Sequence, residues 1–173
     1  MRQIDTIVIH HSASKSGNVD IFRKEHMAKG WTDVGYHCVI CNGHGGYDGQ
    51  VQVGRPDTAI GAAVFGANIG KLHVCLVGNF EQGDIGYSGK PTERQMTSLG
   101  QVICDWQERY GRKFDGRVLG LEGHNEAALK THPTLCPGNQ FPIKTVRNWY
   151  FKVVHDYADS LLDRLVEEGF WNG

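Results

Sequence analysis

The chain has 173 residues, of which 40% are hydrophobic and 21% are charged, and its formal net charge at pH 7 is −1. This length and composition are ordinary for a globular domain with its own core, so we expect a single domain over residues 1–173. The sequence contains no basic or acidic block, which argues against a nucleic acid partner. No stretch approaches the roughly 20 apolar residues that span a bilayer, so we expect no stable membrane insertion.

The N-terminus and the cysteines both bear on the cellular compartment. The chain begins MRQIDTIVIHHS and passes directly into a strand-like segment, which leaves no room for a secretory signal. We therefore expect a protein that is made in the cytoplasm and reaches any other compartment by another route. Its five cysteines are an odd number and are scattered, which is a poor framework for disulfides and typical of a reducing compartment.

The first third of the chain predicts three strands and a helix. Residues 4–10 are dominated by β-branched side chains without a helical period, which indicates a buried strand. Residues 19–30 read as a helix closed by Gly30, which suits the left-handed position after a helix. Residues 36–41 and 50–54 are strand-like, and the Gly-rich run between them predicts a hairpin connection.

The middle of the chain predicts one more strand and a well-marked helix. Residues 72–80 are continuously apolar, as in a central strand, and residues 81–91 read as a loop. Thr92 and Gln95 match a capping box. Apolar residues then recur at three- and four-residue steps up to Gly111, so a helix is expected between the capping box and this glycine.

The last third predicts a short strand and a long C-terminal helix. Residues 117–124 form the strand, which runs into a histidine. Residues 145–168 carry one apolar face and are followed by a glycine. That face consists of Val146, Trp149, Tyr150, Val153, Tyr157, Leu161 and Leu165. Strands and helices together indicate one α/β domain.

Two histidines and a cysteine lie where apolar segments meet loops: His10 in IVIHHS, His124 in GHNE and Cys136 in THPTLCPG. Two nitrogens and one sulfur are the ligand set of a catalytic zinc site that keeps its fourth position for water. These ligands come from both ends of the chain, so folding must build the site, which favours an enzyme over a local zinc knuckle. His10 and the adjacent His11 point to opposite strand faces, and strand parity alone does not choose between them.

A second set of metal-binding residues competes with the first. Cys38, Cys41 and His44 have a spacing compatible with a zinc knuckle, although a lone CxxC is weak evidence and no second pair follows nearby. His73 and Cys75 lie within a predicted strand and are expected to be packing residues. Three further histidines read as surface, helix-side or loop positions: His26, His132 and His155.

Three polar side chains are candidates to assist a metal. Tyr36 opens a strand, and a phenol beside zinc can orient an oxyanion or shuttle a proton, although an ordinary aromatic strand residue is the alternative. Thr134 lies two residues before Cys136 and can present its hydroxyl to the same cleft. Glu126 follows His124 by two residues and is either an acceptor for a ligand imidazole or a solvated carboxylate.

These motifs resemble those of the zinc-dependent N-acetylmuramoyl-L-alanine amidases. This type 2 amidase family includes small phage endolysins, bacterial recycling amidases and animal peptidoglycan recognition proteins. IVIHHSAS resembles the opening strand of the family, which assigns the first zinc ligand to His10 and not to His11. KGWTDVGYHCVI resembles the segment that carries the active-site tyrosine, here Tyr36. GHNE and TLCPG resemble the segments that supply the other two ligands, His124 and Cys136.

The resemblance covers about residue 4 to residue 150, with two departures. Many relatives read GAH where this chain has Gly61, Ala62 and Ala63, so a histidine that helps to hold substrate is missing. Several relatives carry a lysine two residues before the third ligand, where this chain has Thr134, as in catalytic recognition proteins. Neither departure touches the metal ligands.

The resemblance implies a central mixed β-sheet flanked by helices, with zinc in a surface groove. It also implies hydrolysis of the amide between the lactyl group of N-acetylmuramic acid and L-alanine in peptidoglycan. Zinc would lower the pKa of a bound water and polarise the scissile carbonyl. Tyr36 and Thr134 would stabilise the oxyanion or position the water.

The biological setting follows from the architecture. A single domain without a signal sequence or a separate wall-binding module fits a monomeric phage or prophage endolysin acting on thin Gram-negative peptidoglycan. Such an enzyme needs a membrane-permeabilising partner to reach the wall. Two alternatives remain: a cytoplasmic recycling amidase for soluble anhydro-muropeptides, and a non-catalytic peptidoglycan binder, a class that typically loses a zinc ligand.

Overall fold

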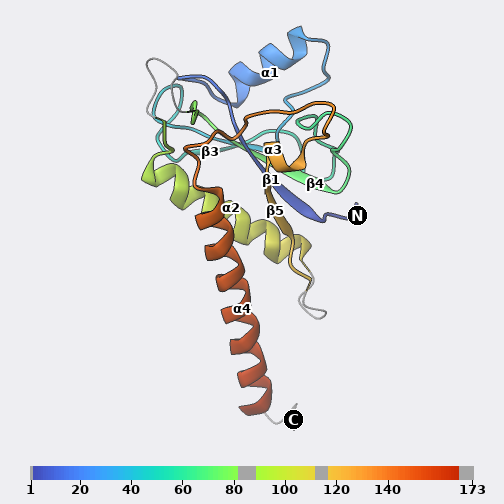
Figure 1. Ribbon diagram of the computed structural model, residues 1–173, viewed down its shortest axis with the longest axis vertical. Coiled ribbons are helices and arrows are strands. Elements are labelled where there is room, and N and C mark those ends of the chain that lie inside the picture. Colours follow the sequence, from blue (N-terminus) through green and yellow to red (C-terminus); the bar gives the residue numbers. More distant parts are fainter. Residues whose placement is uncertain (1, 82–88, 112–116, 168–173) are drawn as a thin grey trace.

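A five-stranded β-sheet forms the centre of the protein (Figure 1). The computed structural model describes residues 2–81, 89–111 and 117–167, with side chains up to residue 156. The strands are β1 (Thr6–His11), β2 (Cys38–Ile40), β3 (Val51–Val53), β4 (Lys71–Leu76) and β5 (Gly120–Gly123), in the order β3-β2-β4-β1-β5. β1 runs parallel to β4 and β5, and β2 runs parallel to β4, whereas β3 is antiparallel to β2. The predicted mixed sheet is confirmed.

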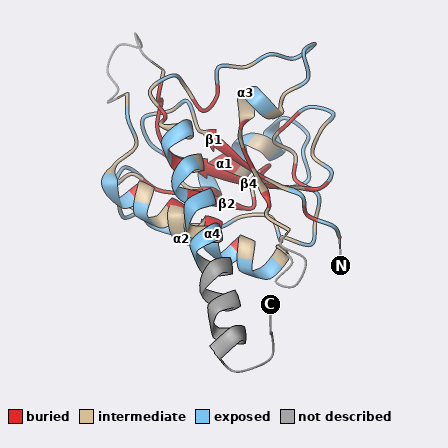
Figure 2. Ribbon diagram, turned by 60° about the horizontal axis from the view of Figure 1, so that its bottom comes forward, coloured by how far each residue is buried: buried red, intermediate tan, exposed pale blue. Residues whose placement is uncertain are grey.

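Helices cover both faces of this sheet. In the described residues they are α1 (Val19–Ala28), α2 (Glu93–Tyr110), α3 (His124–Ala127) and α4 (Ile143–Glu167). Figure 1 shows α1 on one side of the sheet, with α2 and α4 on the other. The short α3 follows β5 directly, so it begins where that strand ends. Figure 2 shows that burial is concentrated in the strands, whereas the helices expose their outer sides.

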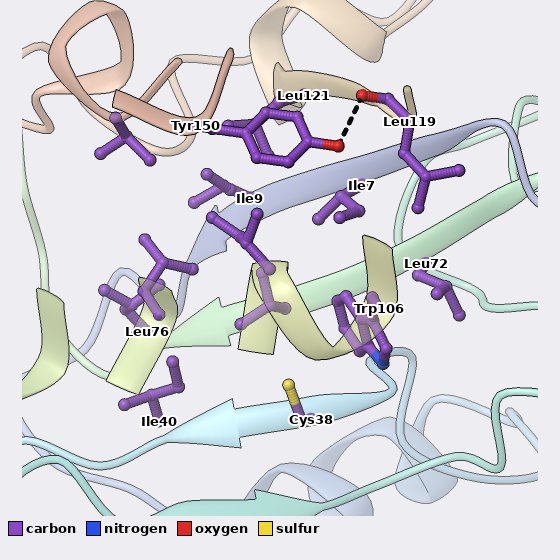
Figure 3. Close-up of a cluster of buried hydrophobic side chains, with 14 of the residues drawn as sticks. Ile7, Ile9, Cys38, Ile40, Leu72, Leu76, Trp106, Leu119, Leu121 and Tyr150 are labelled. Atoms are coloured by element: carbon purple, nitrogen blue, oxygen red, sulfur yellow. Dashed lines mark hydrogen bonds between the residues drawn. The ribbon is translucent and has the colours of Figure 1, made fainter. Parts of the chain in front are cut away.

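The larger hydrophobic core lies between the sheet and the helices α2 and α4 (Figure 3). Ile7 and Ile9 of β1 point into it beside Leu72 of β4. Tyr150 of α4 is fully buried there, and its hydroxyl donates a hydrogen bond to the backbone carbonyl of Leu119 at 3.1 Å. This bond allows a large aromatic side chain to be buried without leaving its hydroxyl unsatisfied.

A smaller core lies on the opposite face of the sheet, under α1. Val19 and Phe22 of α1 pack there against Cys75 of β4. Successive residues of a strand point to opposite faces, so His10 of β1 and His73 of β4 also lie on this side. The chemistry-bearing residues therefore occupy the face that α2 and α4 leave free.

The observed strands are shorter than the predicted ones. The strand predicted over 36–41 spans Cys38–Ile40, and the one predicted over 72–80 spans Lys71–Leu76. The second ends early because the chain turns at Gly78, where an added Cβ would lie 2.4 Å from the ring of Phe80. The other predicted strands change by a few residues at their ends. Most of the predicted loop over 81–91 lies outside the described residues.

The local signals for helix ends are confirmed. Thr92 Oγ1 accepts the amide hydrogen of Gln95 at 3.0 Å, and Gln95 Oε1 accepts that of Thr92 at 3.1 Å. The Gln95 side chain is 1% exposed, and its Nε2 donates to the carbonyls of Ile40 and Val77. The same side chain therefore begins α2 and ties it to the ends of two strands. Gly30 follows α1 with a φ of +88°, the left-handed conformation that was expected there.

The C-terminal helix α4 extends well beyond the sheet (Figure 1). Val146 and Tyr150 are buried, as predicted for its apolar face, but Trp149 is 42% exposed and lies over Gly100 of α2. The side chains of three further predicted face residues lie outside the described residues: Tyr157, Leu161 and Leu165. In the described parts of the chain, no helix combines the length and the apolar character needed to cross a membrane.

Candidate active site

Strand pairing brings the two histidines of the predicted metal set together. β1 and β5 are parallel, and Ile9 pairs with Gly123, so His10 and His124 both come immediately after this pair. The carboxyl ends of parallel strands meet at one edge of a sheet, where ligand sites are commonly built. The rings of His10 and His124 have their centroids 4.6 Å apart.

Cys136 completes the group from a loop that follows α3. Its Sγ lies 3.8 Å from Nδ1 of His10 and accepts the backbone N–H of His11 at 3.3 Å. The loop is held against α3 because Asn125 donates its amide hydrogen to the Cys136 carbonyl at 2.7 Å. The ligand atoms of His10, His124 and Cys136 all lie within 4.8 Å of one another, and they are the one such group among the described residues. Two imidazoles and a thiol at this spacing fit a single zinc ion.

Burial sets the protonation of these candidate ligands in the metal-free protein. It lowers the pKa of His10 well below its usual range, and the neighbouring His73 and His124 lower it further. Burial raises the pKa of Cys136 to about 12, although the hydrogen bond from the His11 amide lowers it. The imidazole of His10 is therefore neutral with a lone pair available, whereas the thiol must lose a proton when a cation binds.

His11 points away from this group. Its Nδ1 accepts the backbone N–H of Phe80 at 3.2 Å, and its ring lies beside the Phe80 ring at a centroid distance of 5.9 Å. The alternation of strand side chains thus separates the two histidines as expected. His10 is 1% exposed and lies with the other metal-ligand candidates, whereas His11 does not belong to that group.

The competing zinc knuckle does not form. Cys38 points into the large hydrophobic core (Figure 3), whereas His44 is exposed on the turn between β2 and β3. Cys38, Cys41 and His44 are all described, and they do not meet the spacing of a metal group. All five cysteines of the chain are unpaired; Cys104 is exposed and the other four are buried.

Tyr36 and Thr134 both lie beside the metal-ligand candidates. The Tyr36 ring is 5.3 Å from the His10 ring, and burial raises the pKa of its phenol well above the usual value, with smaller contributions from Cys75 and Cys136. The phenol therefore stays protonated and remains a hydrogen-bond donor. Thr134 Oγ1 accepts the amide hydrogen of Cys136 at 3.2 Å, which leaves the hydroxyl hydrogen available.

An open cavity of about 410 Å³ adjoins the metal-ligand candidates. His124 and Thr134 form part of its wall, and Ala63 lines it where many relatives carry a histidine. Phe65 is exposed at the cavity and stacks on His132 with ring centroids 4.1 Å apart. The other lining residues are mostly apolar: Trp31, Ala62, Val64, Gly66, Asn68, Ala128 and Leu129.

Two neighbouring residues make contacts that the sequence analysis did not predict. Glu126 does not contact a ligand imidazole; its carboxylate accepts the Gly123 amide hydrogen at 2.8 Å and forms an ion pair with Arg147 of α4. His73 is more than a packing residue, because its Nδ1 lies 3.1 Å from His10 Nε2. His37, which the sequence did not single out, accepts the backbone N–H of His73 at 2.9 Å. The register of β4 beside β1 creates the first contact and its pairing with β2 creates the second, and no local signal in the sequence reports either.

The fold and this group of residues correspond to one class of enzymes. The chain belongs to the N-acetylmuramoyl-L-alanine amidase family, which matches it over residues 1–139. Among curated proteins, it is 37% identical to the endolysin of Escherichia phage T7 over 134 residues, which covers 75% of this chain and 80% of the relative.

Solved structures give the same picture. The N-acetylmuramoyl-L-alanine amidase LysC from Clostridium intestinale URNW superposes with a TM-score of 0.70 at 26% identity, over 85% of each chain. The recognition protein PGRP-SA from Apis mellifera superposes with a TM-score of 0.66 at 21% identity, over 86% of this chain and 84% of that one, which supports the fold alone. The predicted family and fold are both confirmed.

Proposed function

We propose that this chain is a zinc-dependent hydrolase that cleaves the amide between the lactyl group of N-acetylmuramic acid and L-alanine in peptidoglycan. The observation that carries the proposal is the meeting of His10, His124 and Cys136 at one edge of the sheet. A zinc ion held by these three side chains would supply Lewis acidity to the scissile carbonyl and to the attacking water. His124 forms part of the cavity wall, so a substrate bound there would lie next to the proposed metal site.

Tyr36 and Thr134 have complementary roles in this proposal. The phenol of Tyr36 remains protonated, so it can donate a hydrogen bond to the oxygen that becomes negative in the tetrahedral intermediate. Thr134 has its Oγ1 held by the Cys136 amide and lines the cavity, so its hydroxyl hydrogen is available to a group that binds there. Such donors are effective when they are held in place before substrate binds. Thr134 is held by the Cys136 amide, and the Tyr36 ring packs against the core on the α1 face.

The lining of the cavity suits the chemical groups on both sides of the scissile amide. Its apolar lining, including Trp31 and Leu129, matches the methyl groups of the lactyl ether and of L-alanine. Ala63 leaves room where a histidine side chain stands in many relatives, so the substrate contacts on that wall must come from other groups. The exposed Phe65 ring, stacked on His132, offers an aromatic surface on the cavity wall.

We further propose that the chain acts as a monomeric endolysin, with residues 1–173 forming one catalytic domain. The similarity to phage endolysins supports this role. In that setting the enzyme is made in the host cytoplasm and reaches the wall when a partner protein permeabilises the membrane. A recycling amidase would instead act on soluble anhydro-muropeptides in the cytoplasm.

The reaction is tested on purified Gram-negative sacculi and, in parallel, on soluble anhydro-muropeptides. We expect new N-terminal alanine to appear as turbidity falls, without new reducing sugar ends. A chelator should stop the reaction and added zinc should restore it. Reducing ends that appear without sensitivity to the chelator would exclude the amidase, and cleavage of the soluble fragments alone would favour the recycling enzyme. Binding to sacculi without any new termini would indicate a non-catalytic protein.

A further inference from the structure

His10 has two ring nitrogens that face different partners. Its Nδ1 lies 3.8 Å from Cys136 Sγ, within the group of metal-ligand candidates. Its Nε2 lies 3.1 Å from Nδ1 of His73 on the neighbouring strand β4. Both imidazoles are inaccessible to solvent, His10 at 1% and His73 at 0% exposure. Bulk solvent therefore does not reach the contact between the two rings.

The count of protons on these rings fixes the direction of this hydrogen bond once a metal binds. A neutral imidazole has one N–H and one lone pair. If Nδ1 of His10 gives its lone pair to zinc, the hydrogen must be on Nε2, and a buried N–H requires an acceptor. His73 Nδ1 is that acceptor, at a distance typical of N–H donors. The hydrogen of His73 is then on its own Nε2.

The surroundings hold the His73 ring in place. Its backbone amide donates to His37 Nδ1 at 2.9 Å, and the rings of His73 and His37 are stacked with centroids 5.5 Å apart. Gly61 lies against the other side of the ring, where an added Cβ would be only 2.3 Å from His73 Cδ2. A ring confined in this way cannot turn its Nδ1 away from His10.

The remaining nitrogen of His73 supports a specific role for the side chain. His73 Nε2 is buried and has no hydrogen-bond partner in the described part of the protein. An unsatisfied buried polar atom opposes folding, and an aliphatic residue at this position would avoid that penalty. Core packing therefore does not account for an imidazole here, whereas the hydrogen bond to His10 does.

We propose that His73 is a positioning residue for the metal site: it accepts the Nε2 hydrogen of His10 and so presents the Nδ1 lone pair of His10 to the metal. This inference rests on the proposed zinc site. It assigns His73 the function that carboxylates and carbonyls commonly serve behind zinc-bound histidines. Because imidazole is uncharged, the hydrogen bond orients the ligand without adding negative charge to the site.

The first test measures zinc affinity of the full chain by competition with a chelator of known affinity. His73→Leu removes the acceptor and should weaken zinc binding by about 10- to 100-fold. His73→Asn offers an amide oxygen close to the position of Nδ1 and should restore most of the affinity. Val74→Ala is the matched control, because Val74 is a buried neighbour on the opposite face of β4 and contacts the other core. It should lower stability and leave zinc affinity unchanged.

The second test needs no substitution and therefore holds even if a variant fails to fold. Long-range ¹H–¹⁵N correlation spectra of the zinc-loaded protein should show the His10 hydrogen on Nε2 and the His73 hydrogen on Nε2. A His10 ring that binds zinc through Nε2, or a His73→Leu variant that binds zinc as tightly as the wild type, would overturn this inference alone. A wild-type chain that binds no zinc at these ligands would instead overturn the proposed function.

Discussion

The two faces of the central sheet use alternate residues of the same strands but contain different kinds of groups. Toward α2 and α4, β1 presents Ile9 and β4 presents Leu72, both fully buried in an apolar core. The next residues along each strand, His10 and His73, are equally buried on the other face. Buried imidazoles oppose folding unless they are hydrogen-bonded, whereas aliphatic side chains favour it. The apolar face thus supplies stability that allows the other face to hold a reactive group of side chains.

Among substitutions on the two faces of the sheet, His10→Ala is expected to have the largest effect on zinc retention and activity. Removing one of the three proposed ligands should abolish zinc retention and reduce amide hydrolysis to the background of the assay. His11→Ala is the matched control, because the His11 side chain contacts Phe80 and not the metal-ligand candidates, so zinc should remain bound. Metal content by mass spectrometry and alanine release measure both effects. If the two variants exchanged these behaviours, His11 would be the ligand.

A substitution on the apolar face should lower stability and leave zinc content and turnover unchanged. Leu99 of α2 is fully buried in the larger core, and Leu99→Ala should lower the free energy of unfolding by about 2–5 kcal/mol. Zinc content and turnover per folded molecule should not change at temperatures where the variant is folded. Denaturant unfolding and metal analysis are the measurements. A parallel loss of zinc would mean that the two faces are not independent.

Tyr36→Phe tests chemistry without removing a metal ligand. The change keeps the ring that packs on the α1 face and deletes one hydroxyl, so zinc content and melting temperature should change little. Turnover should fall by about a hundredfold or more, as for loss of a preorganised oxyanion donor. Steady-state kinetics at saturating substrate measure the effect. Unchanged turnover would reduce Tyr36 to a packing residue.

Acidic pH should destabilise the protein through the histidine-rich face. Burial lowers the pKa of His37 to about 4, so His37 stays neutral in the folded state, whereas it protonates near pH 6.5 when the chain unfolds. The stability contributed by this depressed pKa is therefore present above about pH 6.5 and is lost as pH falls toward 4, by up to about 1.4 kcal/mol per pH unit.

Denaturant unfolding of the metal-free protein at pH 7 and pH 5 measures this loss. The wild type should lose about 2 kcal/mol more than His37→Asn between these values, because the variant lacks the titrating imidazole. The comparison isolates His37, since the other buried histidines are the same in both chains. Equal losses in the two proteins would mean that His37 has an ordinary pKa in the folded state.

The sequence predicted features whose signals are local. The capping box of Thr92 and Gln95 and the left-handed Gly30 were found because a few neighbouring residues determine them. The motifs around His10, His124 and Cys136 were recognised by family resemblance, and the structure brings these residues together.

Features that depend on distant pairing were not predictable. His73 was expected to pack, because its contact with His10 requires the parallel register of β1 and β4. For Glu126 the alternatives were an acceptor for a ligand imidazole and a solvated carboxylate, but its carboxylate pairs with Arg147, which lies 21 residues further along the chain. The strand after Lys71 was predicted too long, since the turn at Gly78 depends on where the Phe80 ring packs. In each case a tertiary contact determines the structure, and the neighbouring residues in the sequence do not predict it.

The loop that carries Cys136 has a consequence for heat resistance. Cys136 and His10 are 126 residues apart in the sequence, so an ion bound between them would fasten the first strand to a late loop as a removable cross-link. An ion that binds only the folded chain adds stability with concentration, by about 1.4 kcal/mol for each tenfold increase in free ion above the dissociation constant. The melting temperature of this protein would then serve as a gauge of its metal loading.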